Sequence, residues 1–273
     1  MFIFNSKLIN GFDISLSINS ASLNYGFSLF ETVKLFNAKP QMLKEHIYRL
    51  NTSLKCLNMN HKVELKSIEY DIEELIGALD VEEGALKIMI LENEGCYNTL
   101  ITYANRVYKD ELYNNGYKIM LSEYKSNESS LFTYHKTCNY GDNIFALRDA
   151  KSKGFDEIIF ENSKGYISEG SLSNIFLVKN NLIYTPNIES GILNGVMRDL
   201  VISSLDELDI KIIETELSYS DFLEADEVFL SNSLMKVMPV SKLDEKNFDI
   251  KSYKIYKKIR KQLHLVLKED YFG

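Results

Sequence analysis

The chain has 273 residues, 45% of them hydrophobic and 26% charged, which is long enough to bury a sizeable core as one large domain or two modest ones. With 17 Tyr, 15 Phe, 13 Gly and 3 Pro, the composition excludes a disordered, collagen-like or low-complexity chain. The net charge of −8 gives no overall attraction to phosphate backbones or anionic lipid, so neither nucleic acid nor a membrane is an expected partner.

The first 120 residues are expected to form short strands around two helices. A helix is predicted to begin at about Leu43, because apolar residues recur there every three or four positions and would pack on a sheet through one face. The residues of that face are Leu43, Ile47, Leu50, Leu54 and Leu57. Strands are predicted at residues 1–4, 14–18, 30–36, 85–91, 99–104 and 117–122.

A polar stretch without periodicity, SEYKSNESSLFTYH, begins at Ser122 and separates the two halves of the chain. We therefore expect an N-terminal α/β domain at residues 1–121, a linker at 122–133 and a C-terminal domain at 134–273.

The second half is expected to be rich in strands. Runs of apolar residues bounded by Asn, Ser and Gly are typical of hairpins, and Asn180-Asn181 is the expected tight turn. Helices are predicted at 142–153, 196–208, 220–225 and 252–268, the last one docked with a solvated basic face. Strands are predicted at 156–162, 166–170, 174–180, 182–186, 211–217, 227–232 and 237–240.

The common signatures of metal and nucleotide binding are absent. Three cysteines, Cys56, Cys96 and Cys138, are too few and too scattered for a disulfide framework or a zinc site. No HExxH, GxGxxG or P-loop occurs, and the N-terminus has no signal-peptide pattern. We expect a cytoplasmic protein without a bound metal.

Four short segments carry residues suited to a phosphorylated carbonyl cofactor. HKTCNYG contains Lys136, an amine that becomes a nucleophile when its pKa is lowered, and ISEGSLSNIF places Glu169 at the end of a strand. In GILNGVMRDL, Gly195 opens a helix whose free N–H groups suit a phosphate, and FLSNSLMKVMPV adds hydroxyl groups. Each segment taken alone also has an ordinary interpretation. Lys136 is then a solvated lysine, Glu169 a carboxylate in a turn, Gly195 the start of a helix, and the fourth segment a loop.

In order and spacing, these segments resemble the fold-type IV pyridoxal-phosphate enzymes, or class IV aminotransferases. The resemblance begins at LNYGFSLFETVKLFNAKPQMLKEHIYRL and continues through the lysine segment, EGxxSN, NGVMRD and ADEVFLSNSLMKVMPV. It implies a two-domain α/β fold of the α+β type, similar to D-amino-acid aminotransferase, with a smaller N-terminal and a larger sheet-rich C-terminal domain. It also implies pyridoxal 5′-phosphate as cofactor and a homodimer with its active site between the domains.

The resemblance also assigns roles to individual residues. Lys136 matches the lysine that binds the cofactor covalently and moves the substrate proton, and Glu169 matches the carboxylate that pairs with the ring nitrogen. Arg49 matches the phosphate-binding arginine, although a surface arginine on a helix is its alternative interpretation. The other residues matched to the cofactor site are Tyr140, Asn174, Leu193, Val196, Met197 and Ser233. Met197 stands where aminotransferases usually have threonine, and Tyr140 is one residue closer to the lysine than in branched-chain enzymes.

Within the family, the substrate-facing residues favour aminodeoxychorismate lyase, because function depends on the site and not on the fold. Thr32 stands where branched-chain enzymes have glycine, and Phe30 where D-amino-acid enzymes have tyrosine. The resemblance makes Thr32 a catalytic residue and Phe30, Tyr25 and Lys87 substrate-binding residues. Thr32 as a plain strand residue and Lys87 as an outward lysine remain alternatives.

The implied reaction is a β-elimination that releases pyruvate and leaves 4-aminobenzoate for folate synthesis. One feature disagrees: Glu92 and Glu94 occupy a stretch where relatives often carry arginines, and acidic groups there would repel an anionic substrate unless they point away. The alternatives are an aminotransferase acting on branched-chain or D-amino acids, and a catalytically silent binding protein of the same fold.

Overall fold

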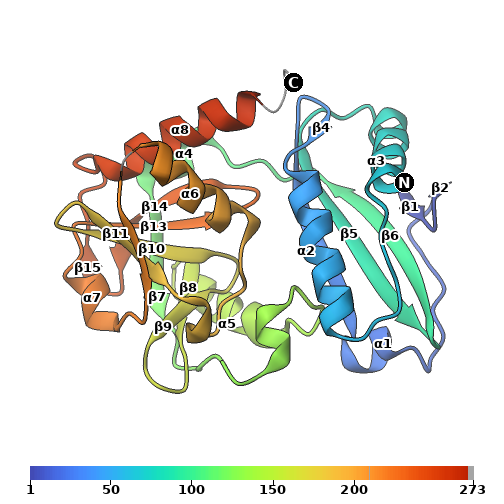
Figure 1. Ribbon diagram of the computed structural model, residues 1–273, viewed down its shortest axis with the longest axis horizontal. Helices are drawn as coiled ribbons and strands as arrows, with labels where there is room; N and C mark the ends of the chain where they lie inside the picture. Colours follow the sequence, from blue (N-terminus) through green and yellow to red (C-terminus); the bar gives the residue numbers. More distant parts are fainter. Residues whose placement is uncertain (209, 270–273) are drawn as a thin grey trace. The chain divides into compact units, whose positions relative to one another are not determined.

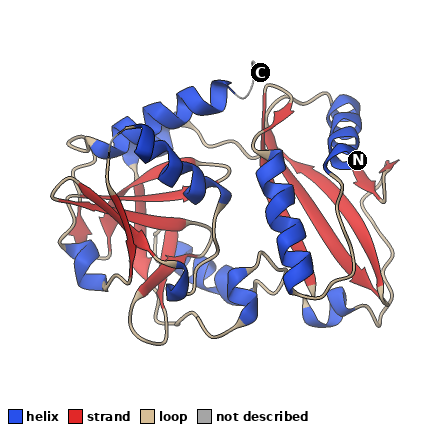
Figure 2. Ribbon diagram, in the orientation of Figure 1, coloured by secondary structure: helices blue, strands red, loops and turns tan. Residues whose placement is uncertain are grey.

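The computed structural model describes residues 1–208 and 210–269, which divide into two compact units. The first contains Met1–Val107 together with His135–Tyr140. The second contains Tyr108–Tyr134 and the described residues from Gly141 onward. Each unit has its own sheet (Figure 2). The mixed α/β class predicted from the sequence is confirmed.

The first unit is built on a six-stranded sheet with the order β2-β1-β6-β5-β3-β4. Its strands are β1 (Phe2–Phe4), β2 (Lys7–Ile9), β3 (Ser28–Phe36), β4 (Lys39–Pro40), β5 (Gly84–Asn93) and β6 (Cys96–Ala104). The centre is an antiparallel meander, because β5 pairs with β3 on one side and with β6 on the other. Residues along β3 alternate between buried and partly buried, so the two faces of this strand have different surroundings.

Two long helices pack on this sheet (Figure 1), α2 (Leu43–Cys56) against β3 and α3 (Leu65–Leu79) against β1 and β2. The predicted apolar face of α2 is confirmed, since all five of its residues from Leu43 to Leu57 are buried. The predicted strand at 14–18 is wrong: the segment has no ladder partner, and its Ser17 N–H donates to the Asn93 side chain. A short helix, α1 (Ala21–Tyr25), follows it, capped by the Ser20 side chain.

A segment distant in sequence completes the first sheet at the edge of β3. Thr137 forms an antiparallel bridge with Leu29, the Phe30 N–H donates to the Lys136 carbonyl at 2.9 Å, and the Cys138 N–H donates to the Ser28 carbonyl at 2.8 Å. Residues 135–140 therefore belong to the first unit, although the chain on both sides of them lies in the second.

The second unit is built on a nine-stranded sheet with the order β12-β11-β10-β13-β14-β7-β8-β9, to which β15 adds at β14. Its strands are β7 (Tyr117–Leu121), β8 (Glu157–Glu161), β9 (Ile167–Gly170), β10 (Asn174–Lys179), β11 (Leu182–Pro186), β12 (Ile212–Thr215), β13 (Glu227–Asn232), β14 (Lys236–Leu243) and β15 (Lys246–Asn247). β7 lies here, parallel to both β14 and β8, whereas the sequence predicts a strand of the first domain at this position. Strand alternation alone does not reveal which sheet a strand joins.

Helices α4 (Asp110–Asn115), α5 (Gly141–Ser152), α6 (Val196–Glu207), α7 (Tyr219–Leu223) and α8 (Ile255–Glu269) complete the second unit, with 3₁₀ turns at Leu131–Tyr134 and Ile188–Ser190. The predicted turn at Asn180-Asn181 is confirmed: both residues have positive φ, and Lys179 pairs with Leu182 across a two-residue loop.

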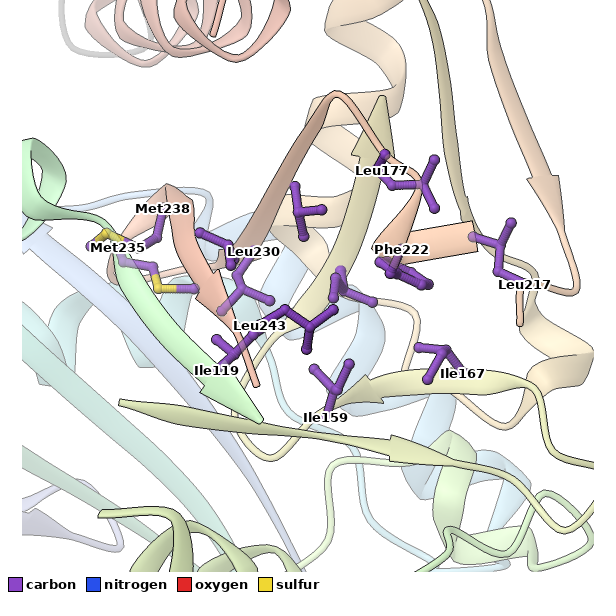
Figure 3. Close-up of a cluster of buried hydrophobic side chains, with 14 residues drawn as sticks. Ile119, Ile159, Ile167, Leu177, Leu217, Phe222, Leu230, Met235, Met238 and Leu243 are labelled. Atoms are coloured by element: carbon purple, nitrogen blue, oxygen red, sulfur yellow. The ribbon is translucent and has the colours of Figure 1, made fainter. Parts of the chain in front are cut away.

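One buried cluster joins the strands of the second unit to α7. It includes Ile119 of β7, Ile159 of β8 and Phe222 of α7, each fully buried, and Figure 3 shows these side chains converging. Phe222 comes from α7, the short helix that follows β12, so the cluster packs this helix against the sheet. Strands β9, β10 and β13 contribute to the same cluster and are therefore parts of one packed scaffold.

Candidate cofactor and active site

Lys136 is placed by its pairing with β3. Its position opposite Phe30 in the bridge directs both side chains to one face of the sheet, and the Lys136 amine lies 4.6 Å from the centre of the Phe30 ring. The same amine lies 5.7 Å from the ring centre of Tyr140, which meets Phe30 edge-on at 5.8 Å. The candidate nucleophile is therefore partly buried beside two aromatic rings.

Three more residues share this face of the sheet, and two of them, Thr32 and Lys87, are predicted site residues. Thr32 is two residues beyond Phe30 and lies opposite Lys87 in the register of β3 and β5. The Lys87 amine lies 4.6 Å from the Phe30 ring centre. Lys34, which the sequence analysis did not select, follows at the next position on the same face. We call the face that carries Phe30, Thr32, Lys34, Lys87 and Lys136 the lysine face.

The two lysines of the strands are partly buried. Among the residues that the structure describes, neither Lys34 nor Lys87 forms a salt bridge, and each amine lies near a phenylalanine ring instead. Burial lowers the pKa of Lys34, an effect that Glu83 partly opposes. Partly buried, unpaired ammonium groups of this kind favour an anionic ligand.

Arg49 is held by a buried glutamate of β3, Glu31. Its Nε donates to Glu31 Oε1 at 2.8 Å and its Nη2 donates to Glu31 Oε2 at 2.6 Å. His46 Nδ1 lies 2.6 Å from the same Oε2. Burial would raise the pKa of Glu31, but Arg49 and His46 together outweigh it and lower the pKa to about 2. Burial lowers the pKa of His46, and its hydrogen bond to Glu31 opposes that fall. Nδ1 is the donor of this bond, because an ionised carboxylate only accepts.

The sequence predicts Arg49 but neither Glu31, which binds it, nor His46, which binds the same carboxylate. Glu31 was detectable, since a carboxylate at an inward position of an alternating strand needs a cationic partner from the helix that covers it. His46 and Arg49 are three residues apart on α2 and so face the same way.

The remaining predicted residues of the first unit lie at its edges. Tyr25 ends α1 and is 76% exposed. Glu92 and Glu94, which would have repelled an anion, are held by nearby loops. Glu92 accepts hydrogen bonds from the N–H groups of Ala21 at 2.8 Å and Gly95 at 2.6 Å. Glu94 accepts one from the Ser17 hydroxyl at 2.9 Å.

In the second unit, Glu169 is fixed by two donors. Its Oε2 accepts a hydrogen bond from Asn174 Nδ2 at 2.9 Å and one from the Leu193 N–H at 3.1 Å. The Asn174 amide also donates to the Leu193 carbonyl at 2.9 Å. Three residues that the resemblance matched to the cofactor site thus form one network, and the sequence separation of Leu193 from the other two is bridged by the fold.

The start of α6 lies beside this network. Gly195 precedes the helix, and a Cβ atom there would be 2.1 Å from Asn174 Oδ1, so only glycine permits this close approach. Val196 and Met197 open α6 and are buried. Their N–H groups belong to the first turn of a helix, where donors suited to a phosphate are available.

Ser233 lies in the connection from β13 to β14. Asn232 shapes this turn: its Oδ1 accepts from the N–H groups of Leu234 at 3.0 Å and Met235 at 2.9 Å. The hydroxyl of Ser231 is buried and has no hydrogen-bond partner within the described part of the chain. An unsatisfied buried donor at the end of β13 is compatible with a ligand bound nearby.

The predicted site residues thus form two groups, one in each unit. The first supplies an amine, a hydroxyl and a guanidinium, and the second supplies a held carboxylate, helix N–H groups and a serine. By their chemistry, the amine of the first group suits an aldehyde, and the donors and carboxylate of the second suit a phosphate and a ring nitrogen, the groups that pyridoxal phosphate carries. No cluster of three or more His, Cys, Asp or Glu side chains able to hold a metal occurs among the described residues.

Comparison with known proteins identifies the family. The profile of the family described as amino-transferase class IV matches residues 28–243. The chain belongs to this family. It is 26% identical over 263 residues to the aminodeoxychorismate lyase of Bacillus subtilis (strain 168), a match that covers 92% of this chain and 89% of that protein.

Two further class IV aminotransferase matches carry a different name. The chain is 29% identical over 261 residues to the "probable branched-chain-amino-acid aminotransferase" of Aquifex aeolicus (strain VF5), covering 89% of this chain and 84% of that one. The crystal structure of the Escherichia coli branched-chain amino acid aminotransferase matches with a TM-score of 0.90 at 24% identity, covering 97% of this chain and 94% of that chain. At this identity, the match to the crystal structure shows that the two chains share a fold.

Family membership confirms the resemblance found in the sequence: the protein is an enzyme that depends on pyridoxal 5′-phosphate. The named relatives include both a lyase and aminotransferases, so membership does not by itself fix the reaction. Within the described residues, the structure has no helix that is both long and apolar enough to cross a membrane.

Proposed function

We propose that the protein is a 4-amino-4-deoxychorismate lyase that releases pyruvate and 4-aminobenzoate. The observation that carries the proposal is the position of Thr32 on the lysine face, opposite Lys87 and next to the Phe30 ring on which the Lys136 amine lies. An elimination needs a base for one proton and a donor for the leaving oxygen, and this face offers an amine and a hydroxyl.

The proposed reaction moves two protons. The Lys136 amine removes the proton from the ring carbon that bears the substrate's amino group. The bond between the neighbouring carbon and the enolpyruvyl oxygen then breaks, and the Thr32 hydroxyl donates the proton that the leaving oxygen requires. The released enolpyruvate becomes pyruvate, and the ring that remains is aromatic, which makes the step strongly downhill.

Pyridoxal phosphate, when bound, supplies a ring that accepts the electrons of the deprotonated carbon. The residues proposed to hold it are Arg49, Ser233 and the N–H groups of Val196 and Met197 at the phosphate, Glu169 at the ring nitrogen, and Tyr140, Asn174 and Leu193 around the ring. Glu169 suits its role because Asn174 and Leu193 already hold its carboxylate in one orientation.

The substrate carries two carboxylates, and the charges of the first unit suit it. Lys87 is proposed to bind one carboxylate, with Phe30 and Tyr25 as further substrate contacts. Lys34 extends the positive charge along the same face. Since Glu92 and Glu94 are engaged by backbone and hydroxyl donors of nearby loops, their charges are partly compensated.

An aminotransferase acting on branched-chain or D-amino acids is the second candidate, favoured by the 29% identity to the Aquifex aeolicus protein. Both reactions use the amine of Lys136. In the aminotransferase reaction the proton taken from the substrate is added to the cofactor, whereas in the lyase reaction a leaving group departs from the substrate.

The test is to incubate the purified holoenzyme with enzymatically prepared aminodeoxychorismate and to measure pyruvate and 4-aminobenzoate. We expect both products in equal amounts, and none from the Lys136→Ala variant. In parallel, the holoenzyme is mixed with branched-chain L-amino acids and with D-amino acids, and the absorbance of the cofactor aldehyde is followed. Conversion to the amine form with release of a keto acid, and no pyruvate from aminodeoxychorismate, would establish the aminotransferase instead.

The proposal includes a homodimer, which the family resemblance implies, in the cytoplasm, which the three scattered cysteines favour. Sedimentation of the holoenzyme should give twice the chain mass of 31.5 kDa. A monomer that retains full activity would contradict it.

A further inference from the structure

The carboxylate of Glu157 organises the turn that joins β9 to β10. That turn, residues 171–173, follows Glu169 at the end of β9 and precedes Asn174 at the start of β10. The geometry of the turn therefore sets how the Glu169 carboxylate meets its Asn174 donor. Glu157 itself lies on β8 and is 3% exposed.

Both oxygens of Glu157 are engaged by this turn. Oε1 accepts hydrogen bonds from the Ser171 N–H at 3.2 Å and from the Ser171 hydroxyl. Oε2 accepts from the Leu172 N–H at 3.2 Å and from the Ser173 hydroxyl at 3.2 Å. A fifth bond, from the Ile158 N–H at 3.0 Å, fixes the carboxylate to its own strand.

A buried carboxylate is costly unless it is well satisfied, and Glu157 forms no salt bridge with any described residue. Burial raises the pKa of Glu157, and the hydrogen bonds from Ser171, Ile158, Leu172 and Ser173 oppose that rise. The arrangement is that of an acceptor dedicated to the donors of one turn.

We propose that Glu157 is a positioning residue for Glu169: by holding the turn from Ser171 to Ser173, it fixes the carboxylate that pairs with the cofactor's ring nitrogen. The inference rests on the role proposed for Glu169. The turn is also closed by the Gly170 N–H, which donates to the Ser173 carbonyl at 2.7 Å. A Cβ at Gly170 would be 2.5 Å from the Ser173 hydroxyl, so the turn has little room to adapt.

The test compares Glu157→Gln with Glu227→Gln. Glu227 is the matched control because it is another buried carboxylate of the second unit, 6% exposed, that accepts three backbone N–H groups. Its donors are the N–H groups of Lys254, Ile255 and Tyr256, which cap α8. Glutamine in either position turns an amide NH₂ toward backbone donors, so both variants should lose stability.

The decisive readout is the ¹⁵N NMR shift of the ring nitrogen in holoenzyme reconstituted with ¹⁵N-labelled cofactor. We expect Glu157→Gln to move this signal toward that of an unprotonated ring and to lower kcat about 10-fold with little change in KM, because a small displacement of a positioned group weakens catalysis. Glu227→Gln should leave both unchanged. Equal signals and equal kcat in the two variants would overturn the inference.

Two further variants keep the test decisive. Ser173→Ala removes a single hydrogen bond to Glu157 Oε2 and serves as the test if Glu157→Gln does not fold. It should shift the nitrogen signal in the same direction as Glu157→Gln but by a smaller amount. An unchanged signal in Ser173→Ala counts against the inference.

Glu169→Gln separates the two proposals. If it leaves the nitrogen signal unchanged, the role of Glu169 is wrong, whereas a shift in Glu169→Gln without one in Glu157→Gln refutes the positioning role alone.

Discussion

Phe30 and Lys136 lie opposite each other at the edge of the first sheet. The Phe30 N–H donates to the Lys136 carbonyl at 2.9 Å, and the Lys136 amine lies 4.6 Å from the centre of the Phe30 ring. The pairing explains how a lysine from a segment far along the chain is held next to Thr32 and Lys87 of the meander. A backbone bridge constrains the position of the lysine Cα, and the ring constrains its side chain. The Lys136 residue is thus constrained both at its backbone and at its amine.

Replacement of Thr32 by Val tests the proposed proton donor. Valine keeps the branched shape but removes the hydroxyl, so we expect kcat for aminodeoxychorismate to fall about 100-fold or more, the typical contribution of general acid catalysis. Cofactor affinity should not change. Thr32→Ser keeps the hydroxyl and serves as the control, with activity within about 10-fold of the parent. Equal activity of the Val and Ser variants would show that Thr32 is only a strand residue.

Replacement of Lys87 and Lys34 by Met tests the anion-binding role of the lysine face. Methionine keeps the unbranched shape and removes the charge, so each variant should raise KM for aminodeoxychorismate about 10-fold, with the larger effect at Lys87, which lies opposite Thr32. The KM of the parent should rise with salt more steeply than that of the variants.

The exposed Lys153, which pairs with Asp149 on the surface, provides the control for the lysine variants. Lys153→Met should leave KM unchanged. If Lys87→Met lowers kcat and leaves KM unchanged, Lys87 does not bind the substrate carboxylate and its proposed role is wrong.

Much of the fold follows from local patterns in the sequence. Alternation in β3, the apolar face of α2 and the Asn180-Asn181 turn were all predictable, because each depends on residues close together in the chain. The sheet that β7 joins was not predictable, since its partners β8 and β14 are distant in sequence and every buried strand has a similar composition.

The candidate site divides in the same way. Lys136 and Glu169 stand out through short motifs, but the partners that hold functional groups in place do not. Glu31 and Glu157 are ordinary strand glutamates in the sequence, and only the fold shows that one binds Arg49 and the other binds the turn after Glu169. Residues that act through another residue leave no local motif.

Glu31 should make stability depend on pH in the acid range. Its pKa in the folded protein is about 2, below the ordinary value of 4.5, so the ionised carboxylate stabilises the fold above that ordinary value, and this contribution is lost as the pH falls toward 2. Glu31→Gln removes the buried charge to which Arg49 and His46 bind and should lower the free energy of unfolding by about 3–5 kcal/mol at neutral pH.

Urea unfolding of both proteins at several pH values measures this contribution. The difference between parent and Glu31→Gln should shrink by about 2 kcal/mol as the pH is lowered from about 6 to about 3, because the unfolded parent takes up a proton that the variant cannot. Glu69→Gln, at an exposed position on α3, is the control and should match the parent throughout. A difference that stays constant with pH would mean that folding does not lower the pKa of the Glu31 carboxyl.

Gly195 should be intolerant of any side chain because of its contact with Asn174. A Cβ atom there would lie 2.1 Å from Asn174 Oδ1, and the Asn174 amide in turn holds Glu169. We expect Gly195→Ala to displace this amide and to weaken cofactor binding about 10-fold or more, measured by fluorescence titration of the apoenzyme. Gly141→Ala at the start of α5, where a Cβ meets nothing within 4 Å, should bind the cofactor as the parent does and be equally stable or slightly more so. Similar affinities in the two variants would show that Asn174 can move without loss, and the network around Glu169 would then not be needed to hold the cofactor.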